Sequence, residues 1–392
     1  MVEGEVSGMS VRVRVEPALL EWAVERAGWS EETAAQRVPK LDEWLAGRTR
    51  PTLKQLERFA HLTHAPLGLL FLPEPPEEPV PIPDMRTFGN RAIVRPSVDL
   101  LDTIYACQSR QDWYRDYANS HGSPDLEFVG SVNTSSDTRE VADEIRQELR
   151  FSVSERTAFA SWREALRQLI DRIEDVGVLV MVNGVVGADT HRKLKPEEFR
   201  GFALADPIAP LIFVNGADTK AAQIFTMVHE LCHIWLGESA LSDAAMAKKS
   251  DKEAELWCNR VAAEVLVPLV EIRSEYGGGA TVNELERLAR RYRVSTLVVL
   301  KRLYDAGFLQ WDDYQARYAA ERQRVVAAMA GREGESGGSF YNTQPLRLGR
   351  RFARAVIADT FEGGTPFRDA YQILGTKKHQ TFENLVASIG AA

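Results

Sequence analysis

The stretch TKAAQIFTMVHELCHIWL, residues 219–236, decides how the rest of the chain is interpreted. Apolar residues occupy most of its positions, which predicts a helix buried nearly all round. Four polar side chains gather on one side of this helix, namely Thr226, His229, Glu230 and His233. Because buried polar groups need partners, we expect that side to face a bound ion or a cluster of hydrogen-bonding groups.

Two histidines four residues apart are typical of a metal site on a helix. His229 and His233 would lie about 40° apart around the axis, so both imidazoles can bind one ion. Glu230 would lie about 100° from His229, too far to share the ion easily but near enough to reach a water bound to it. Zinc lowers the pKa of its water, and such a glutamate can accept the proton. The alternative is a pair of core histidines hydrogen-bonded to their neighbours.

A third ligand is expected from a second helix, predicted over about residues 252–266 and ending before Pro268. One mostly apolar face of this helix carries Glu255, Cys258, Asn259, Ala262 and Leu266. A carboxylate on an apolar face requires a partner, so Glu255 is the better candidate and Glu253 the weaker one. Asp251 falls near the same face, at the start of the helix. A buried ion pair is the alternative role for Glu255.

The other polar residues near these ligands suggest supporting roles. Asn259 follows Glu255 by one helical turn and could hydrogen-bond a metal-binding histidine, or simply pack between helices. Cys232 and Cys258 are expected to be small buried residues rather than ligands. The chain has only 3 cysteines, far apart and with no C-x-x-C pair, so a disulfide framework is not expected.

Composition places the chain among globular proteins. It has 392 residues, 44% hydrophobic and 27% charged, enough for two or three domains. There is no apolar run of membrane-spanning length and no apolar signal core at the N-terminus, so we expect a cytoplasmic protein that does not contact membranes. A net charge of −8 argues against a protein built mainly to bind phosphate backbones.

The pattern of elements predicts an α+β fold that is mostly helical, with a small mixed sheet. Short apolar runs at 178–182, 202–205 and 211–214 predict strands just before the metal helix, and a loop is expected after it. We expect these divisions along the chain: a helical module at 1–72, a proline-rich connector and helix at 73–136, the metal-binding core at 137–275, a helix-turn-helix-like subdomain at 276–330, and a flexible linker with a helical piece at 331–392.

Arginines recur at helical spacing in the C-terminal piece. They are Arg347, Arg350, Arg351 and Arg354. This pattern predicts either a solvated helix face or a basic face for nucleic acid or an acidic partner.

Two motifs together resemble the ImmA/IrrE family of metallopeptidases. The first is His229-Glu-Leu-Cys-His233, and the second is ELWCNRVAAEVLVP, residues 255–268. That family carries H-E-L-x-H followed by E-x-x-x-N-x-F-A-A-E-L-L-M-P. Here Val261 stands in place of the aromatic residue and Val267 in place of the methionine, both conservative changes of apolar residues. The resemblance covers roughly residues 140–310.

The resemblance implies a gluzincin-like (thermolysin-like) core with one Zn²⁺ per chain, for which another divalent ion such as Mn²⁺ could substitute. It implies that His229, His233 and Glu255 are the ligands and that Glu230 is the general base. The implied substrates are repressor-like proteins, cut in stress response or in control of mobile elements. An extended peptide would bind to an edge strand made of Gly201, Phe202, Ala203 and Leu204. The alternative is that this strand lies in the interior of the sheet.

The N-terminal sixty residues resemble an Xre-type helix-turn-helix, through the stretches 47–52 and 56–60. The expected reading helix offers Lys40, Asp42 and Glu43, and acidic residues there repel phosphate. DNA binding through residues 14–72 is therefore one hypothesis, and a protein-docking or autoinhibitory module is the other.

Two functions are consistent with these features. The first is a zinc-dependent endopeptidase that cleaves a regulatory protein, repressor-like or antitoxin-like. The second is an antitoxin or transcriptional regulator that binds DNA or a toxin partner, with a structural or accessory metal. Family members with this fused layout often lie beside small toxin genes.

Overall fold

The computed structural model describes residues 11–78, 80–82, 96–242, 253–330 and 340–390. The chain divides into two compact units. One unit takes its described residues from 1–81 and 94–102, and the other from 82–93 and 103–392. The division falls within helix α5 (Val98–Ser120).

The first unit is a small helical bundle. Its elements are α1 (Pro17–Arg26), α2 (Glu31–Arg37), α3 (Leu41–Leu45), α4 (Leu53–Thr63) and the 3₁₀ helix η1 (Leu67–Phe71). Ser30 caps α2 as predicted, because its hydroxyl accepts the backbone N–H of Thr33. Thr52 and Gln55 form a capping box at the start of α4. Trp44 and Phe59 meet edge to face in the core of the bundle, with ring centroids 6.3 Å apart.

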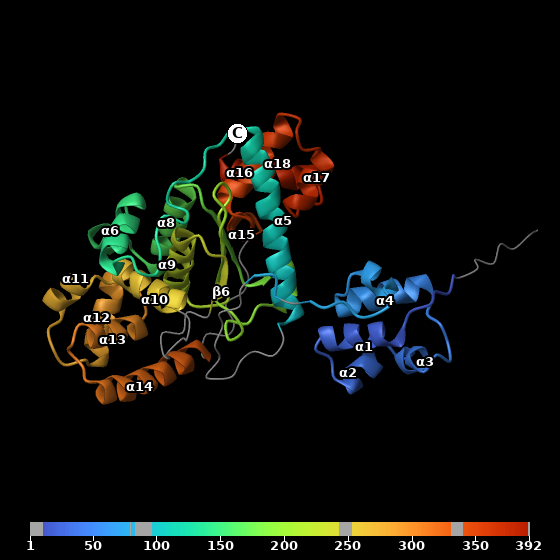
Figure 1. Cartoon of the computed structure of the whole chain (residues 1–392), viewed down its shortest axis with the longest axis horizontal. Helices are drawn as coiled ribbons and strands as arrows, with labels where there is room; N and C mark the ends of the chain where they lie inside the picture. Colours follow the sequence, from blue (N-terminus) through green and yellow to red (C-terminus); the bar gives the residue numbers. More distant parts are fainter. Residues whose placement is uncertain (1–10, 79, 83–95, 243–252, 331–339, 391–392) are drawn as a thin grey trace, which may run out of the picture. The chain divides into compact units, whose positions relative to one another are not determined.

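A sheet surrounded by helices forms the second unit (Figure 1). The strands are β1 (Leu179–Asn183), β2 (Val185–Val186), β3 (Asp189–Lys193), β4 (Gly201–Leu204), β5 (Leu211–Asn215) and β6 (Ala240–Ser242). Besides α5, the helices are α6 (Thr138–Glu148), α7 (Val153–Thr157), α8 (Trp162–Asp175), α9 (Lys220–Leu236), α10 (Glu253–Leu266), α11 (Leu269–Glu275), α12 (Val282–Tyr292), α13 (Thr296–Asp305), α14 (Trp311–Ala330), α15 (Phe340–Leu348), α16 (Arg350–Phe361), α17 (Phe367–Ile373) and α18 (His379–Ile389).

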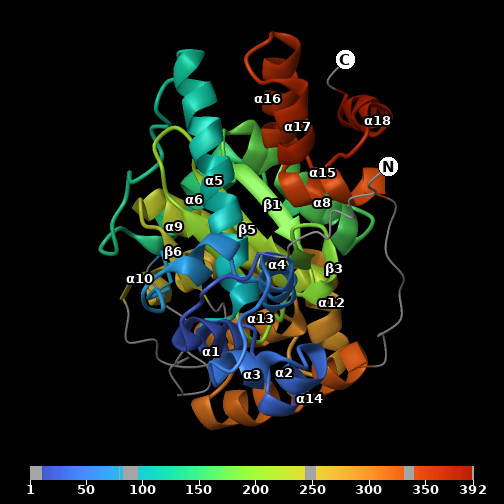
Figure 2. The same cartoon turned by 90° about the vertical axis from the view of Figure 1, so that its right-hand side faces the viewer.

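A mixed four-stranded sheet lies at the centre of this unit, in the order β1-β5-β4-β6. β1 runs parallel to β5, whereas β4 is antiparallel to both β5 and β6. β1 and β6 are therefore the two ends of the sheet as described (Figure 2). A separate hairpin is formed by β2 and β3. This mostly helical arrangement around a small mixed sheet confirms the predicted α+β class.

Helices cover both faces of the sheet. α8 and α9 pack on one face, and α5 lies on the other (Figure 1). Gln111 of α5 donates hydrogen bonds to the carbonyls of Leu204 and Ala209, at 3.0 and 2.8 Å. The core on the α9 side continues without a break into helices α10 to α14. In the part of the chain that the structure describes, no helix combines the length and hydrophobicity needed to cross a membrane.

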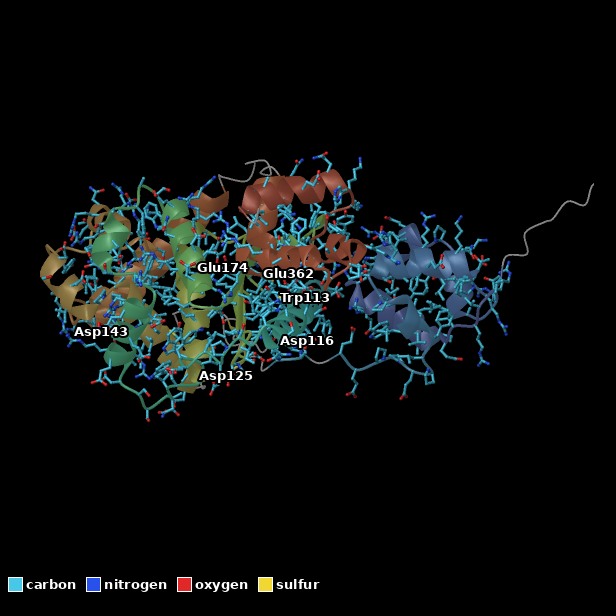
Figure 3. The ribbon with its side chains drawn as sticks, turned by 90° about the horizontal axis from the view of Figure 1, so that it is seen from above. Trp113, Asp116, Asp125, Asp143, Glu174 and Glu362 are labelled. Carbon is cyan, nitrogen blue, oxygen red and sulfur yellow. The ribbon has the colours of Figure 1, made fainter. Side chains whose placement is uncertain are left out.

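The C-terminal helices are attached to the β1 end of the sheet. Gly349, at φ 79°, passes so close to β1 that a Cβ there would lie 2.8 Å from the carbonyl oxygen of Val180. Arg351 donates to the carbonyl of Glu174 at 2.9 Å, and Arg350 pairs with Asp171 at 3.0 Å. Glu174 lies where α8 meets these helices (Figure 3).

Of the two alternatives for these arginines, an open basic face is not favoured, because three of the four have partners within the fold. Arg350 and Arg351 hold the C-terminal helices to α8, and Arg354 donates to the carbonyl of Ile389 at 3.2 Å. Arg347 is partly buried, and burial lowers the pKa of its guanidinium. The helical spacing of the arginines is real, but Arg350, Arg351 and Arg354 each donate to a group within the fold.

Candidate metal centre

Helix α9 places two imidazoles side by side in the interior. Thr219 caps the start of the helix by accepting the N–H of Ala222, and Gly237 ends it in the left-handed conformation at φ 72°. His229 and His233 are fully buried one turn apart, and their Nε2 atoms are 3.3 Å from each other. Two Nε2 atoms at this distance are aimed at a common point.

Helix α10 brings a carboxylate to the same point. Glu255 is 2% exposed; its Oε2 lies 3.4 Å from His229 Nε2 and its Oε1 lies 3.0 Å from His233 Nε2. One ligand atom from each of the three residues fits within 4.8 Å of the others. Glu253, the weaker candidate, is exposed, and Asp251 lies outside the described residues. Of the carboxylates considered within the described ranges, Glu255 is thus the one that meets the histidines.

The electrostatics of these groups suit a cation. Burial by itself would raise the pKa of Glu255, but the charges and hydrogen bonds of His229 and His233 outweigh it and hold that pKa well below its usual range. Burial also lowers the pKa of His233, which favours the neutral imidazole that a metal requires. Two imidazoles and one carboxylate form a ligand set typical of catalytic zinc with an open fourth position. The three residues therefore fit a zinc ion.

Glu230 is fully buried and lies against strand β4. A Cβ built on Gly201 would lie 3.0 Å from Glu230 Oε1 and 2.6 Å from the methyl group of Thr226. Only glycine at this position leaves room for the carboxylate and the methyl group. The group of residues whose ligand atoms converge is made of His229, His233 and Glu255 and does not include Glu230. This placement matches the angular offset expected from its position on the helix.

The supporting role suggested for Asn259 stays a prediction. Among the residues that the structure describes, the Oδ1 of Asn259 and the Nδ1 of His229 are both buried and have no hydrogen-bond partner. Cys232 and Cys258 are free and buried, as predicted, and burial raises the pKa of both thiols. Cys232 donates to the carbonyl of Val228 instead of facing the ligands.

The expectation that Gly201, Phe202, Ala203 and Leu204 form an edge strand is wrong. They form β4, which pairs with β5 on one side and with β6 on the other. The reason is that the chain reverses at Gly237 after the metal helix and adds β6 to β4. Strand β6 lies in a segment that we expected to be a loop. The only sequence signal for it is Ala240-Leu241, two apolar residues that follow the glycine closely.

Comparison with known proteins locates the metal centre within a known domain. Residues 173–304 match the family described as IrrE N-terminal-like domain. Residues 348–388, in the C-terminal helices, match a domain of unknown function (DUF8813).

A curated relative matches part of the chain. The radiation response metalloprotease IrrE of Deinococcus radiodurans is 33% identical over 123 residues, and the match covers 29% of this chain and 36% of that protein. The match thus spans about a third of the relative's length. The family match includes all of α9 and α10 with His229, Glu230, His233 and Glu255. Residues 173–304 are therefore similar to the IrrE N-terminal-like domain, in agreement with the resemblance that the two motifs suggested.

Proposed function

We propose that this protein is a zinc-dependent endopeptidase that cleaves a regulatory protein. The observation that supports this most directly is the convergence of His229, His233 and Glu255, from two helices, on one buried point. The D. radiodurans relative is a radiation response metalloprotease, which supports the same reaction class and a role in stress response. We also assign the core to the gluzincin-like class, because its third ligand is a glutamate on the helix after the HExxH helix.

Each residue of the site has a distinct role in this proposal. His229, His233 and Glu255 would hold the ion, and Mn²⁺ is the alternative to zinc. The bound ion would supply Lewis acidity to a water and to the peptide carbonyl. Glu230 takes a proton from the attacking water and returns it to the leaving amide nitrogen. Because these four residues are at most 2% exposed, their charges act in a medium of low dielectric constant.

Replacement of Glu230 tests the proposed chemistry. We expect Glu230→Gln to keep zinc and to lose cleavage by about a hundredfold or more, since only the proton transfer is removed. Zinc is measured by elemental analysis, and cleavage by mass spectrometry on a repressor-like protein encoded by the same organism. His229→Ala should lose both zinc and cleavage, and Glu253→Ala, at an exposed position of α10, should keep both. Wild-type cleavage rates in Glu230→Gln would exclude this role.

For the N-terminal unit we propose protein docking in preference to DNA binding. The helix in the reading position, α3, has only five residues, and Asp42 on it is exposed. Glu43 beside it accepts a hydrogen bond from Thr49. A short acidic helix is poorly suited to enter a DNA groove.

A gel-shift assay with the protein's own promoter DNA, at several salt concentrations, separates the two roles. We expect no shift that depends on residues 14–72. A salt-sensitive shift that disappears when these residues are removed would support the DNA-binding or antitoxin alternative instead.

A further inference from the structure

The pairing position beside Glu230 is filled by the protein's own chain. Gly201 is the β4 residue that lies against Glu230, and its partner on the other side is Ser242 of β6. The ladder continues with the pairs Phe202–Leu241 and Ala203–Ala240. A peptide that joined the sheet at β4 would need these same positions.

This side of β4 is the one a substrate would need. Glu230 must come within about 3 Å of both the attacking water and the leaving nitrogen, so the bond to be cut lies next to Gly201. An extended peptide gains affinity by pairing its backbone with a strand. The other side of β4 is already paired with β5 over four residues, inside the sheet. Only the side taken by β6 can accept a peptide.

β6 should separate from the sheet more easily than β1 or β5. It has three residues, whereas β1 and β5 have five each, and it stands at the end of the strand order. Its attachment to the metal helix does not depend on the ladder. Ser239 accepts the backbone N–H of Ala205 at 2.9 Å, and Gly237 provides the turn, so the chain stays anchored when β6 detaches.

We propose that β6 occupies the place of the substrate strand, and that an extended peptide displaces it from β4 before cleavage. This proposal rests on the proposed peptidase function. β6 would then act as a competitor within the same chain, and cleavage would require a segment that pairs with β4 better than three residues do.

The side chains of β6 indicate the class of peptide. Leu241 is fully buried opposite Phe202, whose ring stacks on Phe213 with centroids 5.0 Å apart. Ala240 is fully buried opposite Ala203. A peptide in the same place meets the same surfaces. The preferred segment therefore has a small residue followed by a large apolar residue, and it lies in an unfolded part of its protein.

A reducible disulfide that joins β6 to β4 tests this proposal. We choose Ala203→Cys with Ala240→Cys, because both residues are small and directly paired. Directly paired residues of antiparallel strands lie about as far apart as the two residues of a disulfide. The three native cysteines are buried and free. The substrate is a library of synthetic peptides of random sequence, with cleavage followed by mass spectrometry. The phosphine TCEP reduces the disulfide without adding a thiol that would bind zinc.

We expect the oxidised double variant to cut the library at least about tenfold more slowly than the same protein after reduction, with equal zinc content. The cleavage rate of the single variant Ala240→Cys should change neither on oxidation nor on reduction. Cut peptides should be enriched in a small residue followed by a large apolar one. Equal cleavage by the oxidised and reduced forms would overturn the proposal, because a locked β6 could not have been displaced.

Amide hydrogen exchange tests the opening of β6 without any cleavage. In the wild-type protein we expect the amides of residues 240–242 to exchange at least about a hundredfold faster than those of β5, and oxidation of the double variant to remove the difference. Exchange as slow as that of β5 would overturn the proposal. Should the wild-type protein with zinc cut no peptide, the proposed function fails by itself, and the exchange result still decides whether β6 opens.

Discussion

The two ends of helix α10 each bury a glutamate, and the two are satisfied in different ways. Near its start, Glu255 faces two imidazoles, whose charge depends on protonation. Near its end, Glu264 is 6% exposed and pairs with Arg302 of α13, which is 4% exposed. Arg302 also donates to the carbonyl of Val267 at 2.8 Å, and Glu264 accepts the N–H of Leu269 at 3.3 Å.

The difference separates a carboxylate with a structural partner from one that we propose to be a metal ligand. The carboxylate of Glu264 has two partners. One is the guanidinium of Arg302, which is always charged, and the other is the backbone N–H of Leu269. The imidazoles beside Glu255 are weaker partners, since burial lowers the pKa of His233 and favours its neutral form. A buried anion beside neutral imidazoles is most stable with a cation between them. The two ends should therefore respond in opposite ways to mutation and to metal.

The largest effect is expected at the metal end. Glu255→Ala removes one of three ligands, so the purified variant should retain little zinc, whereas the wild type retains one ion per chain. Zinc should raise the thermal midpoint of the wild type and leave that of the variant unchanged, because only bound metal stabilises the fold. Elemental analysis and calorimetry measure the two effects. Full zinc occupancy in the variant would show that Glu255 is not a ligand.

At the other end we expect a loss of stability with no loss of metal. Arg302→Ala leaves Glu264 buried without its cation, which should cost about 3–5 kcal/mol in the free energy of unfolding. Urea denaturation measures this value. Arg290→Ala is the matched control, because its ion pair with Glu286 is exposed and worth at most about 1 kcal/mol.

The double replacement Arg302→Met with Glu264→Leu should recover most of that loss, since it leaves no unpaired charge. Zinc content should match the wild type in all three variants. A loss of zinc in Arg302→Ala would mean that the two ends of α10 are not independent.

The position of His229 beside His233 could be predicted from the sequence because the geometry of one helix is local. Four residues along a helix place His229 and His233 on one side whatever surrounds them. Glu255 could be favoured over Glu253 as the third ligand, because the apolar residues on its helix face predict that this face is buried. The same reasoning predicted α9 and α10 nearly to their observed ends.

Features that depend on long-range pairing could not be predicted in this way. β6 has three residues, and its strand character exists only because β4 lies beside it. Arg351 meets Glu174, which is 177 positions earlier in the chain, so helical spacing alone could not reveal this contact. The hydrogen bond expected at Asn259 is likewise a matter of packing between helices and not of spacing along one helix.

A third buried carboxylate sharpens the comparison and gives the smallest expected effect. Glu174 is 6% exposed and accepts the backbone N–H of Arg351 at 3.1 Å. Its pKa is raised to about 7, because burial outweighs the hydrogen bond from Arg351 and the charge of Arg350, which both lower it. The carboxyl is therefore partly neutral near pH 7.

This raised pKa makes stability depend on pH in a defined direction. Between the ordinary pKa of 4.5 and about 7, the folded protein holds a proton at Glu174 that the unfolded chain has released. Stability contributed by this group should therefore fall as pH rises through that window, by at most about 1.4 kcal/mol per pH unit.

Glu174→Gln keeps an acceptor for Arg351 but cannot ionise. The difference in unfolding free energy between variant and wild type, measured in urea from pH 5 to pH 8, should move steadily in favour of the variant. As a control, the unfolding free energy of Glu148→Gln, a change at an exposed position, should depend on pH as that of the wild type does. The same pH dependence in Glu174→Gln and the wild type would show that the Glu174 carboxyl keeps its ordinary pKa.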